Sequence, residues 1–261
     1  MFFPFHDDNP TSRFPLVTCA IIGLCVASLL YIGWLPPQDA EILTVERAFV
    51  PARVEQLYNP NKIVDVPLQI APRPLPNMQP YYRLFPVRSQ VIATFFSTMF
   101  LHAGWMHLVG NMWFLWLFGN NIEDRLGHVL FMILYLAGGV IASLAHWAMI
   151  PESAMSTPVI GASGAVAAVM GAYIVTCPKA WIRCIFVLIV IPIVVELPAM
   201  LVLGIWFGAQ LIDAIADLHT LTGGVAWWAH VGGFLIGMIL MPILSAIAPR
   251  DETPAKWESA W

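Results

Sequence analysis

The chain has 261 residues, of which 59% are hydrophobic and 11% are charged, and its mean hydropathy is +0.75. Soluble globular domains carry about 25% charged residues, so this composition excludes an ordinary soluble enzyme and predicts a protein that crosses a membrane several times. The net charge of −4 is small and spread along the chain, which gives no reason to expect a nucleic-acid partner.

A helix needs about 20 apolar residues to cross the hydrocarbon core of a bilayer. Six runs are candidates, and in chain order they are Phe14–Leu35, Met106–Ile122, Val129–Ile150, Gly161–Cys177, Ile193–Ile212 and Ala226–Ile247. The run Trp181–Ile191 is also apolar but stops at Pro192, so we expect an interfacial approach to the fifth helix there. The sequence therefore predicts an all-α membrane protein, a bundle of six transmembrane helices. We expect the first of these to stay in the mature protein, and not to be cleaved off as a signal peptide.

A long segment, Pro36–Gly104, separates the first two runs. It contains ten of the 21 prolines, which excludes one regular helix. Its distal part, Ser89–Leu101, is apolar and aromatic, and we expect it to lie in the membrane interface. We find no internal repeat, and residues 14–247 form one predicted membrane domain.

The basic residues predict the orientation. Outside the long segment, all of them fall on the side of the two termini, namely Arg13, Arg125, Lys179, Arg183, Arg250 and Lys256. The short loops on the opposite side, Pro151–Ile160 and Asp213–Val225, contain none. By the positive-inside rule, the tails 1–13 and 248–261 are cytoplasmic and the first loop, 36–104, is extracytoplasmic.

This topology places polar groups from three spans at one depth. The second, fourth and sixth spans all begin at the outer face, and His107 with Asn111, Ser163 and His230 lie in their first turns. Polar and ionisable residues inside a membrane are costly and usually functional. We therefore expect a site just below the outer surface.

Ser163 belongs to the stretch Gly161-Ala162-Ser163-Gly164, in which glycines remove bulk around a hydroxyl. Small residues recur every fourth position from Ser163 and from Gly164, a pattern that lets membrane helices approach closely. By itself this pattern leaves two interpretations open, a nucleophile or one more small packing residue.

His230 has a complementary setting, because the small residues Ala226, Ala229, Gly233 and Gly237 surround it in the sequence. Two helices with such faces can bring a serine hydroxyl and an imidazole within about 2.6–3.2 Å. A neutral histidine would then act as general base toward Ser163. A core histidine bonded to a backbone carbonyl is the alternative for His230 alone.

His107 and Asn111 are four residues apart, so they share one face of the second helix. Both can donate hydrogen bonds, and with the Ser163 backbone N–H they would form an oxyanion hole. His102 lies five residues before His107, about 140° away on a helix, and we assign it a structural role.

Metal binding is the competing interpretation for His102, His107 and His230. No His-x-x-Glu-His motif and no cysteine pair with ligand spacing accompanies them, so we expect neither a metal nor a cofactor. Either Asp213 or Asp217 could orient His230 as the third member of a catalytic triad, but we interpret both as solvated loop residues.

These motifs resemble those of the rhomboid family of intramembrane serine proteases, of the bacterial type. The matching stretches are His102–Asn111 (His-x4-His-x3-Asn), Gly161–Gly164 (Gly-x-Ser-Gly) and Ala229–Gly233 (Ala-His-x-x-Gly). Glu123-Asp124-Arg125-Leu126-Gly127 is similar to the family as well, and the resemblance covers about Phe95–Leu240 in order.

The resemblance implies a six-helix bundle around a water-filled cavity, with Ser163 as nucleophile, His230 as base, and His107 and Asn111 around the oxyanion. Trp206 is similar to a fifth-helix residue at the lateral substrate entry; a lipid-facing aromatic is its alternative. Two features depart from other members: Ala93-Thr94 stand where rhomboids often have a Trp-Arg pair, and Ala167 stands where some have a tyrosine that stacks on the histidine.

The function expected from these features is cleavage of transmembrane segments of other membrane proteins, near their extracytoplasmic end, in a bacterial cytoplasmic membrane. The partners implied are a substrate helix and the lipid bilayer. Two alternatives remain: a non-catalytic rhomboid-like protein that binds membrane helices, and a channel or transporter with a polar site. Labelling of Ser163 by a fluorophosphonate distinguishes the protease from both.

Overall fold

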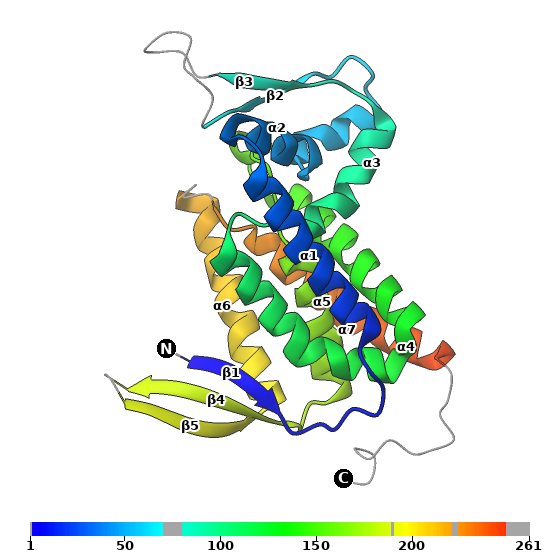
Figure 1. Ribbon diagram of the computed structural model, residues 1–261, viewed down its shortest axis with the longest axis vertical. Helices are drawn as coiled ribbons and strands as arrows, with labels where there is room; N and C mark the ends of the chain where they lie inside the picture. The colour runs from blue at the N-terminus through cyan, green and yellow to red at the C-terminus, as the bar shows by residue number, and fades with distance from the viewer. Residues whose placement is uncertain (1, 70–79, 189–190, 221–223, 249–261) are drawn as a thin grey trace.

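The structure is a computed structural model, which describes residues 2–69, 80–188, 191–220 and 224–248 (Figure 1). This part of the chain is mostly helical. Long helices form a bundle in the middle of the molecule, and a small sheet lies beyond each end of it (Figure 1).

Within the described residues, four helices are long and apolar enough to cross a membrane. They are α1 (Leu16–Trp34), α4 (Trp105–Met149), α6 (Ala199–Thr220) and α7 (Trp227–Ile247). The helix α5 (Ser163–Thr176) is equally apolar but has only 14 residues. The expected first, fourth and sixth runs thus correspond to α1, α5 and α7, within a few residues.

The expected second and third runs both lie in α4, which has 45 residues. Two helical segments meet there at Gly127, whose φ of 75° and ψ of 166° are not helical. A positive φ costs glycine little because it has no Cβ atom. Gly127 therefore allows a break between the runs 106–122 and 129–150 without a loop.

The prediction for the fifth run, Ile193–Ile212, is wrong at its start. Residues up to Pro198 belong to strand β5 (Ile191–Pro198), and α6 begins at Ala199. Prolines at 192 and 198 oppose a helix, and the β-branched residues between them favour a strand. Because α6 continues to Thr220, Asp213 and Asp217 lie in a helix and not in the expected loop.

Strands were not anticipated for an all-α fold. Strand β4 (Trp181–Leu188) occupies most of the run expected to approach the fifth helix at the interface. It pairs antiparallel with β5 and with β1 (Phe2–Asp7), in the order β1–β4–β5. The predicted N-terminal tail is therefore partly a strand.

The long first segment forms a folded layer at the other end of the bundle (Figure 1). It contains α2 (Pro37–Arg47), the 3₁₀ helix η1 (Pro51–Leu57), β2 (Val64–Pro67), β3 (Tyr81–Leu84), α3 (Arg88–Ser97) and the 3₁₀ helix η2 (Thr98–Phe100). A separate apolar cluster stabilises the layer, made of Val45, Val50, Val64, Val66, Leu68 and Leu84. A third 3₁₀ helix, η3 (Glu152–Ala154), follows α4.

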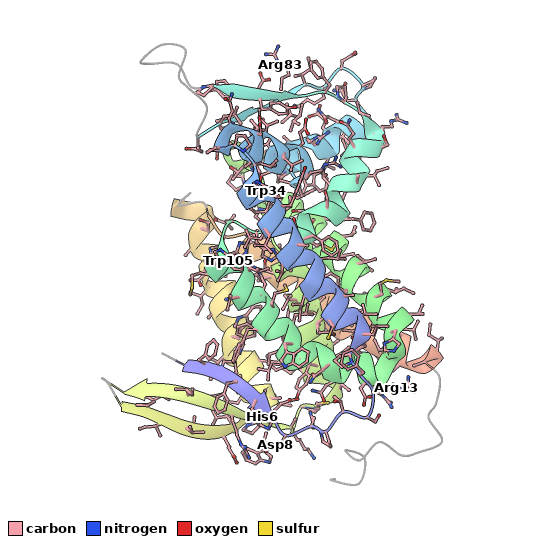
Figure 2. All side chains as sticks on the ribbon, in the orientation of Figure 1. His6, Asp8, Arg13, Trp34, Arg83 and Trp105 are labelled. Atoms are coloured by element: carbon pink, nitrogen blue, oxygen red, sulfur yellow. The ribbon has the colours of Figure 1, made fainter. Side chains whose placement is uncertain are left out.

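The two ends of the bundle differ in their side chains. Figure 2 shows Trp34 and Trp105 near the end that carries the folded layer, and Arg13, His6 and Asp8 near the opposite end. Trp34 is 89% exposed and Trp105 57%, which is typical of tryptophans at a membrane interface.

Helix α5 lies between α4 and α7 and packs against both through small residues. A Cβ atom added at Gly171 would lie 1.9 Å from the Phe234 carbonyl oxygen, and one at Gly237 would lie 1.9 Å from that of Ala168. On the other side, a Cβ at Gly138 would lie 2.4 Å from the Cβ of Ala168. The small-residue faces predicted for α5 and α7 are therefore confirmed as contact surfaces.

Candidate functional site

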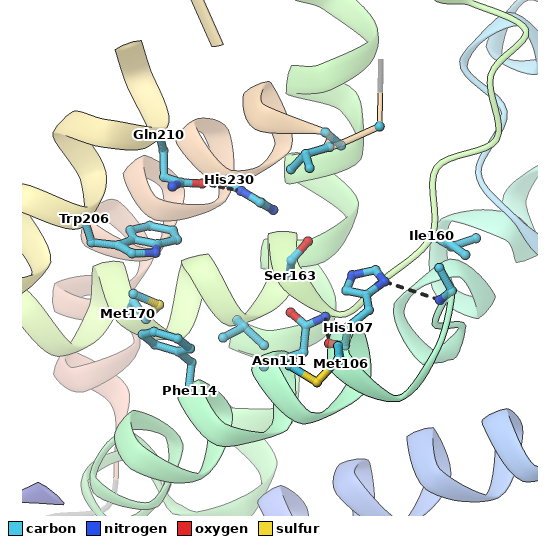
Figure 3. Close-up of a pocket in the computed structure, with 16 residues that line it drawn as sticks. Met106, His107, Asn111, Phe114, Ile160, Ser163, Met170, Trp206, Gln210 and His230 are labelled. Atoms are coloured by element: carbon cyan, nitrogen blue, oxygen red, sulfur yellow. Dashed lines mark hydrogen bonds between the residues drawn. The ribbon is translucent and has the colours of Figure 1, made fainter. Parts of the chain in front are cut away.

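A cavity of about 420 Å³ lies where α4, α5, α6 and α7 meet (Figure 3). Ser163, His107, Asn111 and His230, the four residues predicted from the sequence, all line it. The apolar part of its wall comes from the side chains of Phe114, Val166, Met170 and Trp206. Three stretches separated by more than 50 residues are thus brought together around one space.

Ser163 is the first residue of α5 and is half-buried. The residue two positions before it, Gly161, has a φ of 126°, and its backbone N–H donates to the Thr98 carbonyl at 3.0 Å. A Cβ at Gly161 would lie 2.8 Å from His107 Nε2 and 3.7 Å from Ser163 Oγ. A side chain at 161 would therefore fill the space beside the serine hydroxyl.

His230 enters the cavity from the first turns of α7 and is 9% exposed. Its Nδ1 atom lies 2.5 Å from Oε1 of Gln210, a residue of α6 (Figure 3). Two tryptophans contact the ring: the centroid of Trp227 is 5.8 Å away, edge-on, and that of Trp206 is 6.1 Å away. Figure 3 shows Ser163 between His230 on one side and His107 with Asn111 on the other.

His107 and Asn111 stand one turn apart on α4, and the side chain of Asn111 contacts the backbone of His107. The Asn111 side-chain amide donates to the His107 carbonyl at 3.0 Å. The backbone N–H of Ala103 donates to His107 Nδ1 at 3.3 Å. The ring of His107 is therefore fixed through Nδ1, and its Nε2 atom is the one close to Gly161.

The hydrogen-bond partners of the two histidines favour protons on opposite nitrogens. A neutral imidazole has one donor and one acceptor nitrogen. His107 accepts at Nδ1, so its Nε2–H is a donor; His230 faces a carbonyl oxygen at Nδ1, so that nitrogen carries the proton and Nε2 accepts. The cavity thus contains one histidine suited to donate to an anion and one suited to take a proton.

The structure separates the remaining candidates from the site. His102 is 4% exposed and does not line the cavity, but its ring lies 5.2 Å from that of His107. Among the described residues that line the cavity, none is a carboxylate, so Asp213 and Asp217 are not part of its wall.

Gln210 and Trp227 were missed by the sequence analysis. A signal for Gln210 was present, because it is the one amide in the apolar run 199–212 and follows Trp206 by four residues. For Trp227 the sequence offered no such signal, since aromatic residues are common at the ends of membrane spans.

Comparisons with known proteins relate the chain to one family. Residues 89–247, more than half of the chain, match the Rhomboid domain family. The chain is 32% identical over 170 residues to Rhomboid-like protein 11, chloroplastic, of Arabidopsis thaliana. The aligned segment covers 63% of this chain and 55% of that protein.

Two further relatives come from a fish and a bacterium. The chain is 29% identical to Presenilin-associated rhomboid-like protein A, mitochondrial, of Danio rerio, over 56% of this chain and 39% of that protein. It is 31% identical to Rhomboid protease GluP of Bacillus subtilis (strain 168), over 56% of this chain and 27% of that protein. The chain spans between about a quarter and about half the length of these relatives. Because the family model matches more than half of the chain, we conclude that this chain belongs to the rhomboid family.

Proposed function

We propose that the protein is an intramembrane serine endopeptidase that uses Ser163 as nucleophile and His230 as general base. The observation that carries this proposal is the single cavity in which a serine hydroxyl, an accepting imidazole nitrogen and two further donor side chains converge. One of the relatives, from Bacillus subtilis, is itself named a rhomboid protease.

In the first step, Ser163 Oγ attacks the carbonyl carbon of the scissile peptide bond while His230 Nε2 takes the hydroxyl proton. The tetrahedral intermediate collapses as His230 returns this proton to the leaving amine, which gives an acyl-enzyme and the first product. Water then attacks the acyl-enzyme with the same base, and Ser163 is regenerated with the second product as a carboxylic acid. Both steps need the His230 proton on Nδ1, as the Gln210 contact favours.

The oxyanion of each intermediate would accept hydrogen bonds from His107 Nε2–H, the free N–H of the Asn111 amide and the Ser163 backbone N–H. The last group belongs to the N-terminal turn of α5, whose dipole favours negative charge. Preorganised donors of this kind are each worth about 10²–10³-fold in kcat.

The substrate we propose is the transmembrane helix of another membrane protein, cut near its extracytoplasmic end. The apolar wall formed by Phe114, Val166, Met170 and Trp206 suits an apolar side chain next to the scissile bond. We further propose that α1, the two segments of α4, α5, α6 and α7 make six crossings of a bacterial cytoplasmic membrane. Both termini would then be cytoplasmic, as the distribution of Lys and Arg favours.

Ser163→Ala and His230→Ala test this function. With a transmembrane substrate in proteoliposomes, each variant should lose at least about 10³-fold in kcat, because nucleophile and base act as a unit. The exposed residues Ser153 and His6 offer matched controls, and Ser153→Ala and His6→Ala should cleave at the wild-type rate. Cleavage that survives Ser163→Ala would refute the proposal.

A non-catalytic rhomboid-like protein that binds membrane helices is the alternative function. A fluorophosphonate probe separates the two without a known substrate, because it reacts only with an activated serine. We expect covalent labelling of Ser163 in the wild type and none in His230→Ala. An unlabelled wild-type protein that still retains a transmembrane partner would favour the alternative.

A further inference from the structure

Gln210 is a buried amide in an otherwise apolar stretch of α6. It is 8% exposed, and its Oε1 atom lies 2.5 Å from Nδ1 of His230, a residue 20 positions further along the chain. Burying an amide among apolar side chains is unfavourable unless it is hydrogen-bonded. The position is thus one that packing alone would give to an apolar residue.

The aromatic contacts of His230 cannot replace this hydrogen bond. Trp206 and Trp227 restrict the plane of the imidazole, but a ring face or edge does not distinguish Nδ1 from Nε2. The Gln210 carbonyl oxygen does distinguish them, because an oxygen of this kind only accepts. It therefore retains the proton on Nδ1 and leaves Nε2 free to accept.

Helix α5 offers His230 no stacking ring, because Ala167 stands where the family resemblance implies a tyrosine. This residue is fully buried, and a Cβ atom at Gly233 of α7 would lie only 3.3 Å from its Cβ atom. The same added atom would lie 2.2 Å from the Gly164 carbonyl oxygen. Because α5 presents only small side chains here, the hydrogen-bond partner of His230 comes from another helix, α6.

We infer that Gln210 is the positioning residue of the general base: it sets the tautomer and the rotation of His230, so that the base is competent only while α6 is docked on α7. This inference rests on the proposed function. The docking surface itself is aromatic, with Phe207 stacked on Phe234 at a centroid distance of 4.8 Å and Trp206 at 5.9 Å from the same ring. Among the described residues, the titratable groups that interact electrostatically with His230 are His107 and His146 of α4. His146 in turn interacts electrostatically with Asp217 of α6.

Two substitutions at the same position test the inference. Gln210→Leu keeps the size but removes the acceptor, and it should lower kcat by at least about tenfold while KM changes little. The expected loss is below the about 10⁴-fold that follows removal of the charged orienting residue of a serine-protease triad. Gln210→Glu keeps an acceptor, so it should retain activity, and a carboxylate beside the ring should move the acidic limb of the pH–rate profile to higher pH.

Further measurements distinguish a positioning role of Gln210 from a role in the stability of the fold. Ala209→Leu, at the exposed neighbouring residue, controls for adding a leucine to α6, and circular dichroism with the unfolding temperature checks each variant. The ¹⁵N NMR signals of His230 should show protonated Nδ1 in the wild type and a mixture of tautomers in Gln210→Leu. A structural role alone would leave the tautomer of His230 in Gln210→Leu as it is in the wild type.

The outcomes also separate this inference from the proposed function. Fluorophosphonate labelling of Ser163 in the wild type together with an equal rate in Gln210→Leu would overturn the inference and leave the protease intact. No labelling of the wild type would overturn the proposed function, and the inference with it. If Gln210→Leu fails to fold, wild-type ¹⁵N signals that show His230 protonated on Nε2 remain the refuting result.

Discussion

At the scale of single residues, the contact between α5 and α7 depends on glycines at positions where the backbones touch. A Cβ atom at Gly237 would overlap the Ala168 carbonyl oxygen, at 1.9 Å. Backbone atoms cannot move aside as a flexible side chain would, so any larger residue must separate the two helices. Since Ser163 and His230 stand on these same helices, their spacing depends on residues well below the cavity.

We therefore predict that Gly237→Ala destabilises the protein by about 1–3 kcal/mol, as overpacking of a core does. It should also lower the cleavage rate, because α7 carries the base. Thermal unfolding in detergent and the substrate cleavage assay measure the two effects. Gly204 has open space around it, so Gly204→Ala in α6 is the matched control and should preserve both quantities.

At the scale of elements, the start of α1 is capped by a residue more than 100 positions away. Glu123 of α4 is 1% exposed and accepts from the backbone N–H groups of Val17 at 2.7 Å and Thr18 at 2.8 Å. It also accepts from the Thr18 hydroxyl at 2.7 Å. Pro15, the residue before the helix, provides no side-chain cap. The stretch Glu123–Gly127 therefore has a structural explanation: its carboxylate fixes α1 to α4.

Glu123→Ala should cost about 2–4 kcal/mol in the free energy of unfolding, because it removes the acceptor of three donors at the start of α1, two of them buried, and the partner of His128. Glu123→Gln keeps an acceptor oxygen and should cost less. Equilibrium unfolding by denaturant in mixed micelles gives both values. Glu196 pairs with Arg183 at an exposed position, so Glu196→Ala should leave the stability nearly unchanged; equal losses in Glu196→Ala and Glu123→Ala would contradict the capping role.

At the scale of the whole molecule, the N-terminal strand joins the end of the bundle that is opposite to the cavity. Besides its pairing with β4, its Asp7 carboxylate accepts from the Tyr173 hydroxyl of α5 at 2.8 Å and from the Asn121 amide of α4 at 2.6 Å. The Trp113 indole N–H donates to the Pro4 carbonyl at 2.8 Å. Strand β1 thus connects α4, α5 and the hairpin that leads into α6.

Burial raises the pKa of Asp7 to about 6, although its hydrogen bonds oppose this shift. A native pKa above the unfolded value means that the folded protein holds the proton more tightly, so this group's contribution to stability is complete at about pH 4 and is lost as the pH rises through 6. Between pH 4.5 and 7, we expect the wild type to lose about 2 kcal/mol relative to Asp7→Asn.

Unfolding of both proteins over this pH range measures the difference. Asp8, the residue that follows the strand, is exposed and lies 3.6 Å from Arg183, so Asp8→Asn controls for the loss of a negative charge next to Asp7. If the wild type and Asp7→Asn show parallel pH dependence, the carboxyl of Asp7 is not buried in solution as it is in this structure.

Much of the fold followed from the sequence because apolar runs are a direct consequence of the bilayer. The bounds of α1, α5 and α7 came within a few residues of the expected runs, since their composition alone decides that they are helices. The start of α6 did not, because the apolar composition of Ile193–Pro198 suits a membrane span, whereas its prolines and β-branched residues favour the strand that pairs with β4. The layer formed by α2, β2 and β3 was missed because the prolines of this segment excluded one long helix but did not reveal its short elements.

The sequence by itself determined that the chain crosses a membrane, and it pointed to Ser163, His107, Asn111 and His230 as one group, because polar residues inside a bilayer are rare and their depth follows from topology. Only the tertiary structure decided how His230 is oriented. The partner, Gln210, lies on a helix whose rotation no periodicity specifies, and the contact depends on the approach of α6 to α7. A hydrogen bond between helices is set by packing in three dimensions, whereas the expectation of a polar site needed only the order of residues along the chain.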